Sequence, residues 1–289
     1  MMLILGAGGM LGHQMWLQLG ETQDVVGTLR LPHARLQALT TSRRRLHVGI
    51  DARDLPRIET LLEVLRPAAV VNCVGVVKQL PKGQDPETCI QLNSLFPHQL
   101  SRLCAAAGIR LIHISTDCVF SGRRGGYREE DEPDAEDFYG RSKALGEVTG
   151  RGALTLRTSI IGHELRRGRS LLEWFLAREG EAAGYAGARW NGLTTVELAR
   201  VVRDRVLARP ELEGLYHVAS APLCKDELLR RIAAVYGLGT VVKSQAEPVS
   251  DHSLDGSRFA AATGWRVPEW GAMLAELREE WLRRGELYQ

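Results

Sequence analysis

A glycine-rich turn near the N-terminus constrains the fold of this 289-residue chain more than any other segment. Residues 2–5 predict a short buried strand, and a helix is expected over residues 10–19. Three glycines at intervals of three join them: Gly6, Gly9 and Gly12. Glycine here lets the backbone turn tightly, approach a pyrophosphate and pack helix on strand. The start of the helix, at Met10 and Leu11, offers N–H groups to that anion. The turn therefore predicts a dinucleotide-binding unit.

Short apolar runs alternate with amphipathic segments through the first half of the chain. The expected strands are 2–5, 24–29, 46–50, 68–71, 111–114 and 153–157, and the expected helices include 10–19, 54–65, 85–107 and 139–148. Six strands alternating with helices predict an α/β fold with a parallel sheet covered on both faces. After residue 162 the alternation becomes irregular, with helices expected over 170–178, 194–207, 225–236 and 270–284, a strand over 215–218, and a loop or short strand over 184–191. This second half predicts a smaller lobe over the carboxyl ends of the strands.

The residues that follow the second and third strands bear on the choice of cofactor. A site that prefers NAD usually has an acidic residue near the end of the second strand, but this strand ends at Arg30. An arginine suits a 2′-phosphate, so the sequence favours NADP(H), with NADH possible. The alternative is a surface arginine. Asp51 follows the third strand and could accept a hydrogen bond from the adenine amino group, or serve as a helix cap.

The segment after the fourth strand should border the ligand crevice, because ligands bind at the carboxyl ends of parallel strands. Its candidate cofactor contacts are Cys73, Val74 and Gly75. Lys78 could meet a phosphate or a sugar hydroxyl, although a solvated loop lysine fits nearly as well. Asn93, expected on the side of the helix 85–107 that faces the sheet, is a further candidate cofactor contact.

A hydroxyl, a phenol and an ammonium are expected to converge after the fifth strand. Residues 111–114 lead into Thr116, while Tyr139 and Lys143 lie four apart and so share one helix face. A nearby ammonium should lower the pKa of Tyr139, which could then exchange a proton with a carbonyl or alcohol oxygen held by Thr116. Only five of the 37 basic residues are lysines, which favours a specific role for Lys143. The alternative is an exposed pair without function.

Composition excludes several other classes of protein. A net charge of +2 gives no reason to expect nucleic acid, and no apolar run approaches the ~20 residues that span a bilayer. Five scattered cysteines without a Cys-x-x-Cys pair predict reduced thiols in a cytoplasmic protein. The histidines form no His-x-x-x-His pair, so no metal site is expected. Neither a hydrolase elbow nor a phosphate-binding Walker loop is present.

Together these motifs resemble the extended short-chain dehydrogenases/reductases, and within them the dTDP-4-dehydrorhamnose reductase group of nucleotide-sugar enzymes. The resemblance rests on the glycine turn and on the segments Ser115-Thr116-Asp117-x-Val119-Phe120, Tyr139-x-x-x-Lys143, Arg157-Thr158-Ser159 and Ser253-Leu254-Asp255. It covers residues 1 to about 162 well and the rest loosely. It implies a Rossmann-type doubly wound sheet, with an NADP(H)-binding domain over 1–162 to which 192–220 return, and a C-terminal substrate-binding lobe made of 163–191 and 221–289.

The resemblance also implies a reaction. A hydride would pass from NADPH to the ketone carbon of a 4-keto-6-deoxy nucleotide sugar, in cell-surface polysaccharide or deoxysugar biosynthesis. Tyr139 would protonate the oxygen, Lys143 would lower the pKa of Tyr139 and hold the nicotinamide ribose, and Thr116 would position the carbonyl. Further cofactor contacts would be Ser115, Thr158, Ser159 and Ile160. The candidate sugar contacts are Lys78, Asp117, Val119, Phe120, Trp174, Arg189 and Trp190. A homodimer is expected, with the helices 85–107 and 139–149 pairing across a two-fold axis.

Two other functions fit the same motifs. One is a nucleotide-sugar epimerase that keeps NAD(P) bound, against which Arg30 argues mildly. The other is a non-catalytic, NADP-binding regulatory subunit, because one fold can host many functions. Such a subunit would be expected to lack the threonine, tyrosine or lysine, and all three are present.

Overall fold

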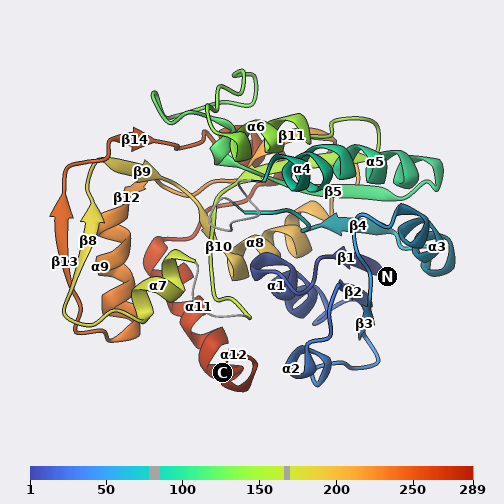
Figure 1. The fold of residues 1–289 in the computed structure, drawn as a ribbon, viewed down its shortest axis with the longest axis horizontal. Helices are drawn as coiled ribbons and strands as arrows, with labels where there is room; N and C mark the ends of the chain where they lie inside the picture. The colour runs from blue at the N-terminus through green and yellow to red at the C-terminus, as the bar shows by residue number, and fades with distance from the viewer. Residues whose placement is uncertain (78–84, 166–169, 289) are drawn as a thin grey trace.

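A parallel sheet forms the centre of the computed structural model, which describes residues 1–77, 85–165 and 170–288. The strands of the sheet lie in the order β11-β6-β5-β4-β1-β2-β3 (Figure 1). They are β1 (Met2–Leu5), β2 (Val25–Leu29), β3 (Arg44–Val48), β4 (Ala69–Asn72), β5 (Arg110–Thr116), β6 (Ala153–Thr158) and β11 (Gly214–His217). Every neighbouring pair is parallel, which confirms the predicted sheet. A seventh strand joins the six of the alternating half, because the segment expected over 215–218 pairs with β6.

Helices cover both faces of this sheet. One face carries α1 (Met10–Leu19), α8 (Thr195–Val201) and α11 (Trp270–Arg283), and the other carries α3 (Leu55–Leu65) and α5 (Phe96–Ala106). Along β1, Met2 and Ile4 belong to the first core cluster, whereas Leu3 and Leu5 belong to the second. Successive side chains of a strand point to opposite faces, so an unbroken apolar strand is what a sheet buried on both faces requires.

Local signals placed several elements accurately. The helix expected over 10–19 is α1, and the helix expected over 225–236 is α9 (Lys225–Tyr236). Asp54 caps α3, since its carboxylate accepts a hydrogen bond from the N–H of Arg57 at 3.2 Å. Pairing with β2 moves β3 two residues earlier than the expected 46–50, because Val25 lies opposite Arg44. Strand register is set by the neighbouring strand rather than by local composition.

The helix expected over 85–107 is interrupted. It consists of α4 (Pro86–Cys89), a π-helical turn η2 (Ile90–Leu95) and α5. Pro97 has no backbone N–H, so the carbonyl of Asn93 cannot receive the usual bond from four residues on. Such wider turns are typical of functional regions. This one turns the side chain of Asn93 toward the segment that follows β4.

A smaller lobe lies beside the sheet, at the left of Figure 1. Its strands are β8 (Glu181–Tyr185) parallel to β13 (Val241–Gln245), and β9 (Ala188–Trp190) between β12 (Leu223–Cys224) and β14 (Ser250–Asp251). The segment expected as loop or short strand over 184–191 thus contains β9 and the end of β8. A short ladder of β7 (Ile160–Ile161) and β10 (Leu193–Thr194) leads out of the sheet.

Shorter helices complete the fold. They are α2 (Ala34–Gln37), η3 (Asp117–Val119), α6 (Phe138–Leu145), α7 (Leu171–Leu176), η4 (Val202–Val206), α10 (Ser257–Thr263) and α12 (Gly285–Tyr288). The helix expected over 194–207 is α8 followed by the π-turn η4, and the hydroxyl of Thr194 caps it by accepting from the N–H of Glu197 at 3.3 Å. Across the described ranges, no helix combines the length and apolar character needed to cross a bilayer.

Candidate active site

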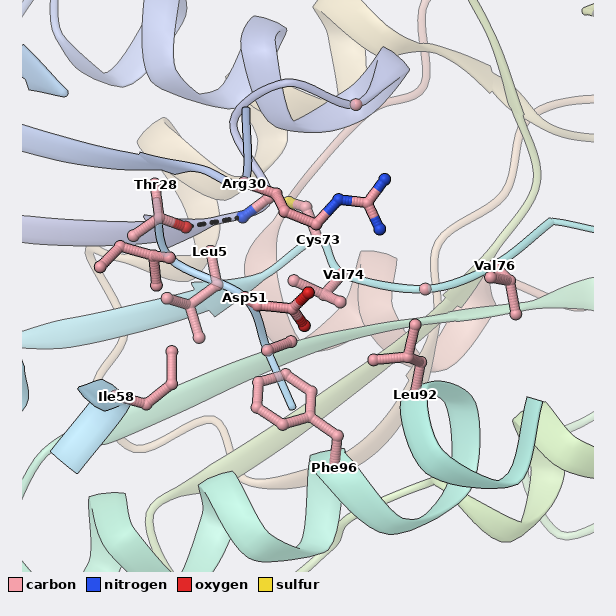
Figure 2. A pocket seen from close by; sticks show the side chains of 15 residues that line it. Leu5, Thr28, Arg30, Asp51, Ile58, Cys73, Val74, Val76, Leu92 and Phe96 are labelled. Atoms are coloured by element: carbon pink, nitrogen blue, oxygen red, sulfur yellow. Dashed lines mark hydrogen bonds between the residues drawn. The ribbon is translucent and has the colours of Figure 1, made fainter. Parts of the chain in front are cut away.

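The glycine turn brings the start of α1 against the end of β1. Gly6 adopts a φ of +83°, and its N–H donates to the hydroxyl of Thr28 at 3.1 Å, which ties the turn to β2 (Figure 2). A β-carbon on Gly12 would lie 2.0 Å from the carbonyl oxygen of Gly6, so only glycine permits this approach. Met10 is half-buried and Leu11 buried at the start of the helix. The backbone N–H groups of this first turn are therefore held at the edge of a pocket.

That pocket has a volume of about 270 Å³ and lies where β1, β2, β3 and β4 end. Seven of the predicted cofactor contacts line it: Gly6, Gly9, Arg30, Asp51, Cys73, Val74 and Gly75. Its apolar wall comes from Ile58, Leu92 and Phe96, which the sequence analysis did not identify (Figure 2). An apolar surface suits a flat base, and the glycine turn suits a pyrophosphate. The residues present thus fit a dinucleotide.

Charged groups flank this pocket on the β2 and β3 side. Arg30 is exposed and extends along the pocket, while the carboxylate of Asp51 lies close by (Figure 2). The guanidinium of Arg53 donates two hydrogen bonds to the carboxylate of Asp51, from Nη2 to Oδ2 at 2.6 Å and from Nε to Oδ1 at 3.0 Å. These hydrogen bonds, with a smaller contribution from Arg30, lower the pKa of Asp51 to about 2. Asp51 is therefore a paired turn carboxylate that also faces the pocket.

Thr116, Tyr139 and Lys143 come together as predicted. Thr116 is buried at the end of β5, and its side chain forms a hydrogen bond with Tyr139. Tyr139 lies in the first turn of α6, which begins after the cap Asp137, whose carboxylate accepts from the N–H of Gly140 at 2.8 Å. Lys143 is buried one turn later, and its Nζ donates to the carbonyl oxygen of Ile114 at 2.8 Å. The end of β5 thus anchors both catalytic candidates of α6.

The pKa of Tyr139 differs from the prediction. Burial raises it above its usual range, and the hydrogen bond between Tyr139 and Thr116 only partly opposes this. We predicted that Lys143 would lower it. Instead, the ammonium is held by the strand carbonyl, and desolvation outweighs any help it gives to the phenolate. Burial also lowers the pKa of Lys143 to about 8, against the opposing charge of Glu147 and the thiol of Cys73.

Ser115, the neighbour of Thr116, faces a buried ion pair. Its hydroxyl donates to Oε1 of Glu147 at 2.7 Å, and Nη2 of Arg157 pairs with Oε2 of Glu147 at 2.7 Å. Arg157 lies opposite Ser115 in the ladder of β5 and β6, and its guanidinium also covers the ring of Phe120. The resemblance motif Arg157-Thr158-Ser159 therefore begins with a structural residue. The predicted cofactor contact of Ser115 stays a prediction.

The ends of β5 and β6 also surround Asp117. Its carboxylate is buried and accepts hydrogen bonds from Thr116, at 3.0 Å, and from Ser159. Burial raises its pKa, while the nearby ring of His252 and these hydrogen bonds oppose the rise. Thr158 lies opposite Thr116 in the ladder, and Ile160 starts β7 just beyond.

His252 is a candidate site residue that the sequence did not predict. It belongs to the lobe, its ring packs against Gly122, and its Nδ1 is buried without a hydrogen-bond partner among the described residues. Its only signal was its place directly before the Ser253-Leu254-Asp255 segment. No spacing relates it to Asp117, because the two are 135 positions apart in the chain (252 minus 117).

The other predicted sugar contacts are dispersed. Val119 and Phe120 are fully buried, with Phe120 stacked on Tyr127 at 4.1 Å, so they support the site from behind. Trp190 is buried against Trp270, whereas its neighbour Arg189 is exposed and lies 3.8 Å from Asp251. Trp174 is half-buried on α7 beneath the guanidinium of Arg178. Lys78 lies outside the described residues.

Asn93 takes a position behind the pocket. It is buried, its Oδ1 accepts from the N–H of Val76 at 3.0 Å, and its Nδ2 donates to the hydroxyl of Ser142 at 3.1 Å. Its amide thus joins the segment after β4 to α6. Whether it also contacts a cofactor stays a prediction. Within the described ranges, no three His, Cys, Asp or Glu side chains are grouped so as to hold a metal ion.

Comparisons with known proteins bear on the family and the fold of this chain. The family model described as RmlD substrate binding domain matches residues 1–280. A probable dTDP-4,6-dihydroxy-2-methyloxan-3-one 4-ketoreductase from Streptomyces antibioticus is 30% identical over 76% of this chain and 71% of that protein. A probable low-salt glycan biosynthesis reductase from Haloferax volcanii is 33% identical, but the match spans 55% of this chain and about half, 52%, of the relative.

A solved structure supports the fold. It is dTDP-4-dehydrorhamnose reductase from Bacillus anthracis in complex with NADP, which has a TM-score of 0.76 and 18% identity to this chain. The alignment covers 96% of this chain and 98% of that one. At this identity the likeness concerns the arrangement of the backbone alone.

Proposed function

The chain belongs to the RmlD substrate binding domain family, and from that membership and the geometry of its site we propose that it is an NADPH-dependent reductase of a 4-keto-6-deoxy nucleotide sugar. The observation that carries the proposal is the meeting of Thr116, Tyr139 and Lys143 at the end of β5, next to the pocket at the glycine turn. The product would enter deoxysugar or cell-surface polysaccharide biosynthesis, in keeping with the names of the relatives.

The three side chains divide the chemistry. Bound NADPH supplies a hydride to the ketone carbon. Tyr139 gives its proton to the ketone oxygen, and its raised pKa keeps it protonated until that oxygen becomes negative. The hydroxyl of Thr116, which donates to Asp117 in the structure, turns its proton to the same oxygen when the ketone binds and orients it. The ammonium of Lys143 then stabilises the phenolate that remains, and a proton from solvent restores Tyr139. One ketone, one hydride and one proton give one alcohol.

The glycine turn and the pocket beside it form the proposed cofactor site. Arg30 favours NADPH over NADH, because a guanidinium can pair with a 2′-phosphate. Asp51 does not oppose that phosphate strongly, since Arg53 already neutralises its charge. Thr158, Ser159 and Ile160 border the nicotinamide in this proposal, together with Ser115, Tyr139 and Lys143.

The proposed division of the chain follows from these contacts. Residues 1–162 and 192–220 hold the cofactor, while 163–191 and 221–289 form the lobe that binds the sugar nucleotide. Asp117 faces the sugar hydroxyls from the sheet, and His252 faces Asp117 from the lobe. The exposed guanidinium of Arg189 suits a diphosphate, whereas buried Trp190 and half-buried Trp174 shape the lobe around it.

A homodimer forms part of the proposal. Two apolar side chains of η2 and two of α6 are exposed: Ile90, Leu95, Phe138 and Leu145. Leu145 is 69% exposed, which favours a partner surface over these helices. Leu145→Glu should then shift the protein to the monomer in size-exclusion chromatography, and an unchanged elution volume would rule this surface out. All five cysteines lie in the described ranges as thiols, which supports a cytoplasmic enzyme.

Absorbance at about 340 nm tests the proposed reaction, because reduced nicotinamide absorbs there. Purified protein is mixed with NADPH and a panel of 4-keto-6-deoxy nucleotide sugars, beside the Tyr139→Phe variant. Oxidation by the native protein alone supports the reductase and identifies its substrate. Tight NADPH binding without oxidation would instead favour an epimerase or a regulatory subunit. Mass and NMR analysis of the recovered sugar then separates those two.

A further inference from the structure

The C-terminal helix α12 reaches the cofactor-binding turn through Tyr288. The hydroxyl of Tyr288 lies 3.0 Å from Nε2 of His13 and 2.8 Å from the side-chain amide nitrogen Nε2 of Gln14. His13 and Gln14 belong to α1, and all three residues are buried. The ring of His13 also meets that of Tyr288 edge to face, with centroids 5.7 Å apart. Residues far apart in the chain thus form one buried cluster.

Donor and acceptor roles in this cluster follow from one fixed point. Nδ1 of His13 lies 2.9 Å from the carbonyl oxygen of Gly9, which can only accept, so Nδ1 carries the proton. Burial lowers the pKa of His13 to about 4, so the ring is neutral and Nε2 is an acceptor. The hydroxyl of Tyr288 therefore donates to His13 and accepts from the amide of Gln14. By donating to Nε2, Tyr288 stabilises the tautomer of His13 whose Nδ1–H donates to the carbonyl oxygen of Gly9.

Gly9 connects the cluster to the cofactor pocket. It is the N-cap of α1, it lines the pocket, and its N–H donates to the carbonyl oxygen of Gly6 at 3.0 Å. Its carbonyl oxygen receives both the backbone N–H of His13, at 3.1 Å, and the ring of the same residue. Residues that fix the turn fix the N–H groups that a pyrophosphate would meet.

We propose that Tyr288 is a positioning residue for cofactor binding, acting through His13 on the turn at Gly9. The proposal rests on the proposed NADPH-dependent function, because it assigns Tyr288 to that cofactor's site. Tyr288 touches neither the pocket nor the reacting atoms. It holds the first turn of α1 in the shape that binds the dinucleotide, so its loss should weaken NADPH binding without slowing the chemistry of bound substrate.

The chain offers a matched control in Tyr236. Tyr236 and Tyr288 line the same cavity of about 340 Å³ and both are hydrogen-bonded to a histidine. The hydroxyl of Tyr236 lies 2.8 Å from Nε2 of His163, which follows β7. The ring of His163 packs 5.3 Å from that of Tyr288, but its nitrogens are bonded to Tyr236 and Glu173 and not to Gly9. Tyr288→Phe and Tyr236→Phe therefore remove the same atom from neighbouring sites, and only the first removes a hydroxyl that is hydrogen-bonded to α1.

The experiment measures NADPH binding to the protein by the fluorescence of the reduced cofactor, with the melting temperature recorded for each variant. Tyr288→Phe should raise the Kd for NADPH by about three- to tenfold, the range for loss of one buried hydrogen bond. Tyr236→Phe should leave that Kd unchanged. With a sugar substrate, Tyr288→Phe should raise the KM for NADPH and leave kcat unchanged.

Several outcomes overturn the inference. Equal Kd values for the native protein and Tyr288→Phe would overturn it, as would equal weakening by both tyrosine variants, which indicates general destabilisation. In a His13→Leu background, Tyr288→Phe should have no further effect, and additive losses would show that Tyr288 does not act through His13. A native protein that binds no NADPH would instead contradict the proposed function.

Discussion

The carboxyl edge of the sheet and the lobe beside it differ in how directly the sequence leads to the site. At the sheet edge, Thr116 ends β5, while Arg30 and Asp51 follow β2 and β3 and line the pocket. In the lobe, Arg189 and Trp190 are neighbours on β9, yet one is exposed and the other is core. In a parallel sheet the carboxyl ends of the strands meet at one edge, so residues at those ends come together. In a lobe of short strands, the way each strand pairs decides which of its side chains are buried and which are exposed.

The strongest test of the sheet edge is Lys143→Met, which keeps the length of the side chain and removes its charge. The phenolate of Tyr139 would lose its stabilising ammonium, so kcat/KM should fall by about 10²- to 10⁴-fold. The matched control is Lys225→Met at the exposed start of α9, which should keep its activity. NADPH oxidation measures both, and a similar rate in the two variants would contradict the role of Lys143.

In the lobe, the two neighbours on β9 should separate stability from binding. Trp190→Ala removes a buried ring that packs on Trp270, and it should lower the free energy of unfolding by about 3–5 kcal/mol. Arg189→Ala should change it by less than about 1 kcal/mol, because its ion pair is exposed. Denaturant unfolding measures both. If Arg189→Ala raises the KM of the sugar nucleotide at unchanged stability, β9 presents one functional side chain; unaltered kinetics would remove Arg189 from the site.

The pH dependence at the sheet edge is set by Lys143. Its pKa is lowered to about 8 from 10.5, so the ammonium is lost above pH 8 in the folded protein. The pH dependence of kcat/KM reports the pKa values of essential groups in the free enzyme. The kcat/KM for NADPH should therefore fall about tenfold per pH unit above pH 8. Between pH 8 and 10.5 the unfolded chain keeps the proton of this lysine while the folded protein has lost it, so this group makes the folded protein more stable as the pH rises. Unfolding caused by this lysine therefore does not explain the loss of activity. A profile that stays flat to pH 10 would show that the ammonium is not needed.

Arg30 offers the smallest expected effect at the sheet edge. Arg30→Ala should raise the KM for NADPH by about five- to tenfold and leave that for NADH nearly unchanged, because only the 2′-phosphate loses its partner. Arg35→Ala, on the exposed surface of α2, is the matched control. Steady-state rates with both cofactors decide the matter, and equal losses with NADPH and NADH would mean that Arg30 does not read the phosphate.

Much of the sheet could be predicted from the sequence because its signals are local. The glycine turn, the cap at Asp54 and the apolar strands each act within a few residues. They were enough to predict α1, α3 and a parallel sheet. Leu92 and Phe96 escaped prediction because the π-turn at η2 sets which side of the helix faces the pocket. His252 escaped because only tertiary packing brings it to Asp117. The direction in which the pKa of Tyr139 shifts depends on burial, which the spacing of residues in the sequence does not reveal.

The contact between His13 and Tyr288 has a consequence for how the protein is made. The two residues are 275 positions apart, so a chain synthesised from its N-terminus cannot form this contact until Tyr288 has also emerged. The strands β1 and β2 and the turn between them can meet much earlier, because they lie within the first 30 residues. Contacts of such long range are slow to close. The turn at Gly9 can therefore form before its support from Tyr288 and acquires that support only after the intervening residues have been made.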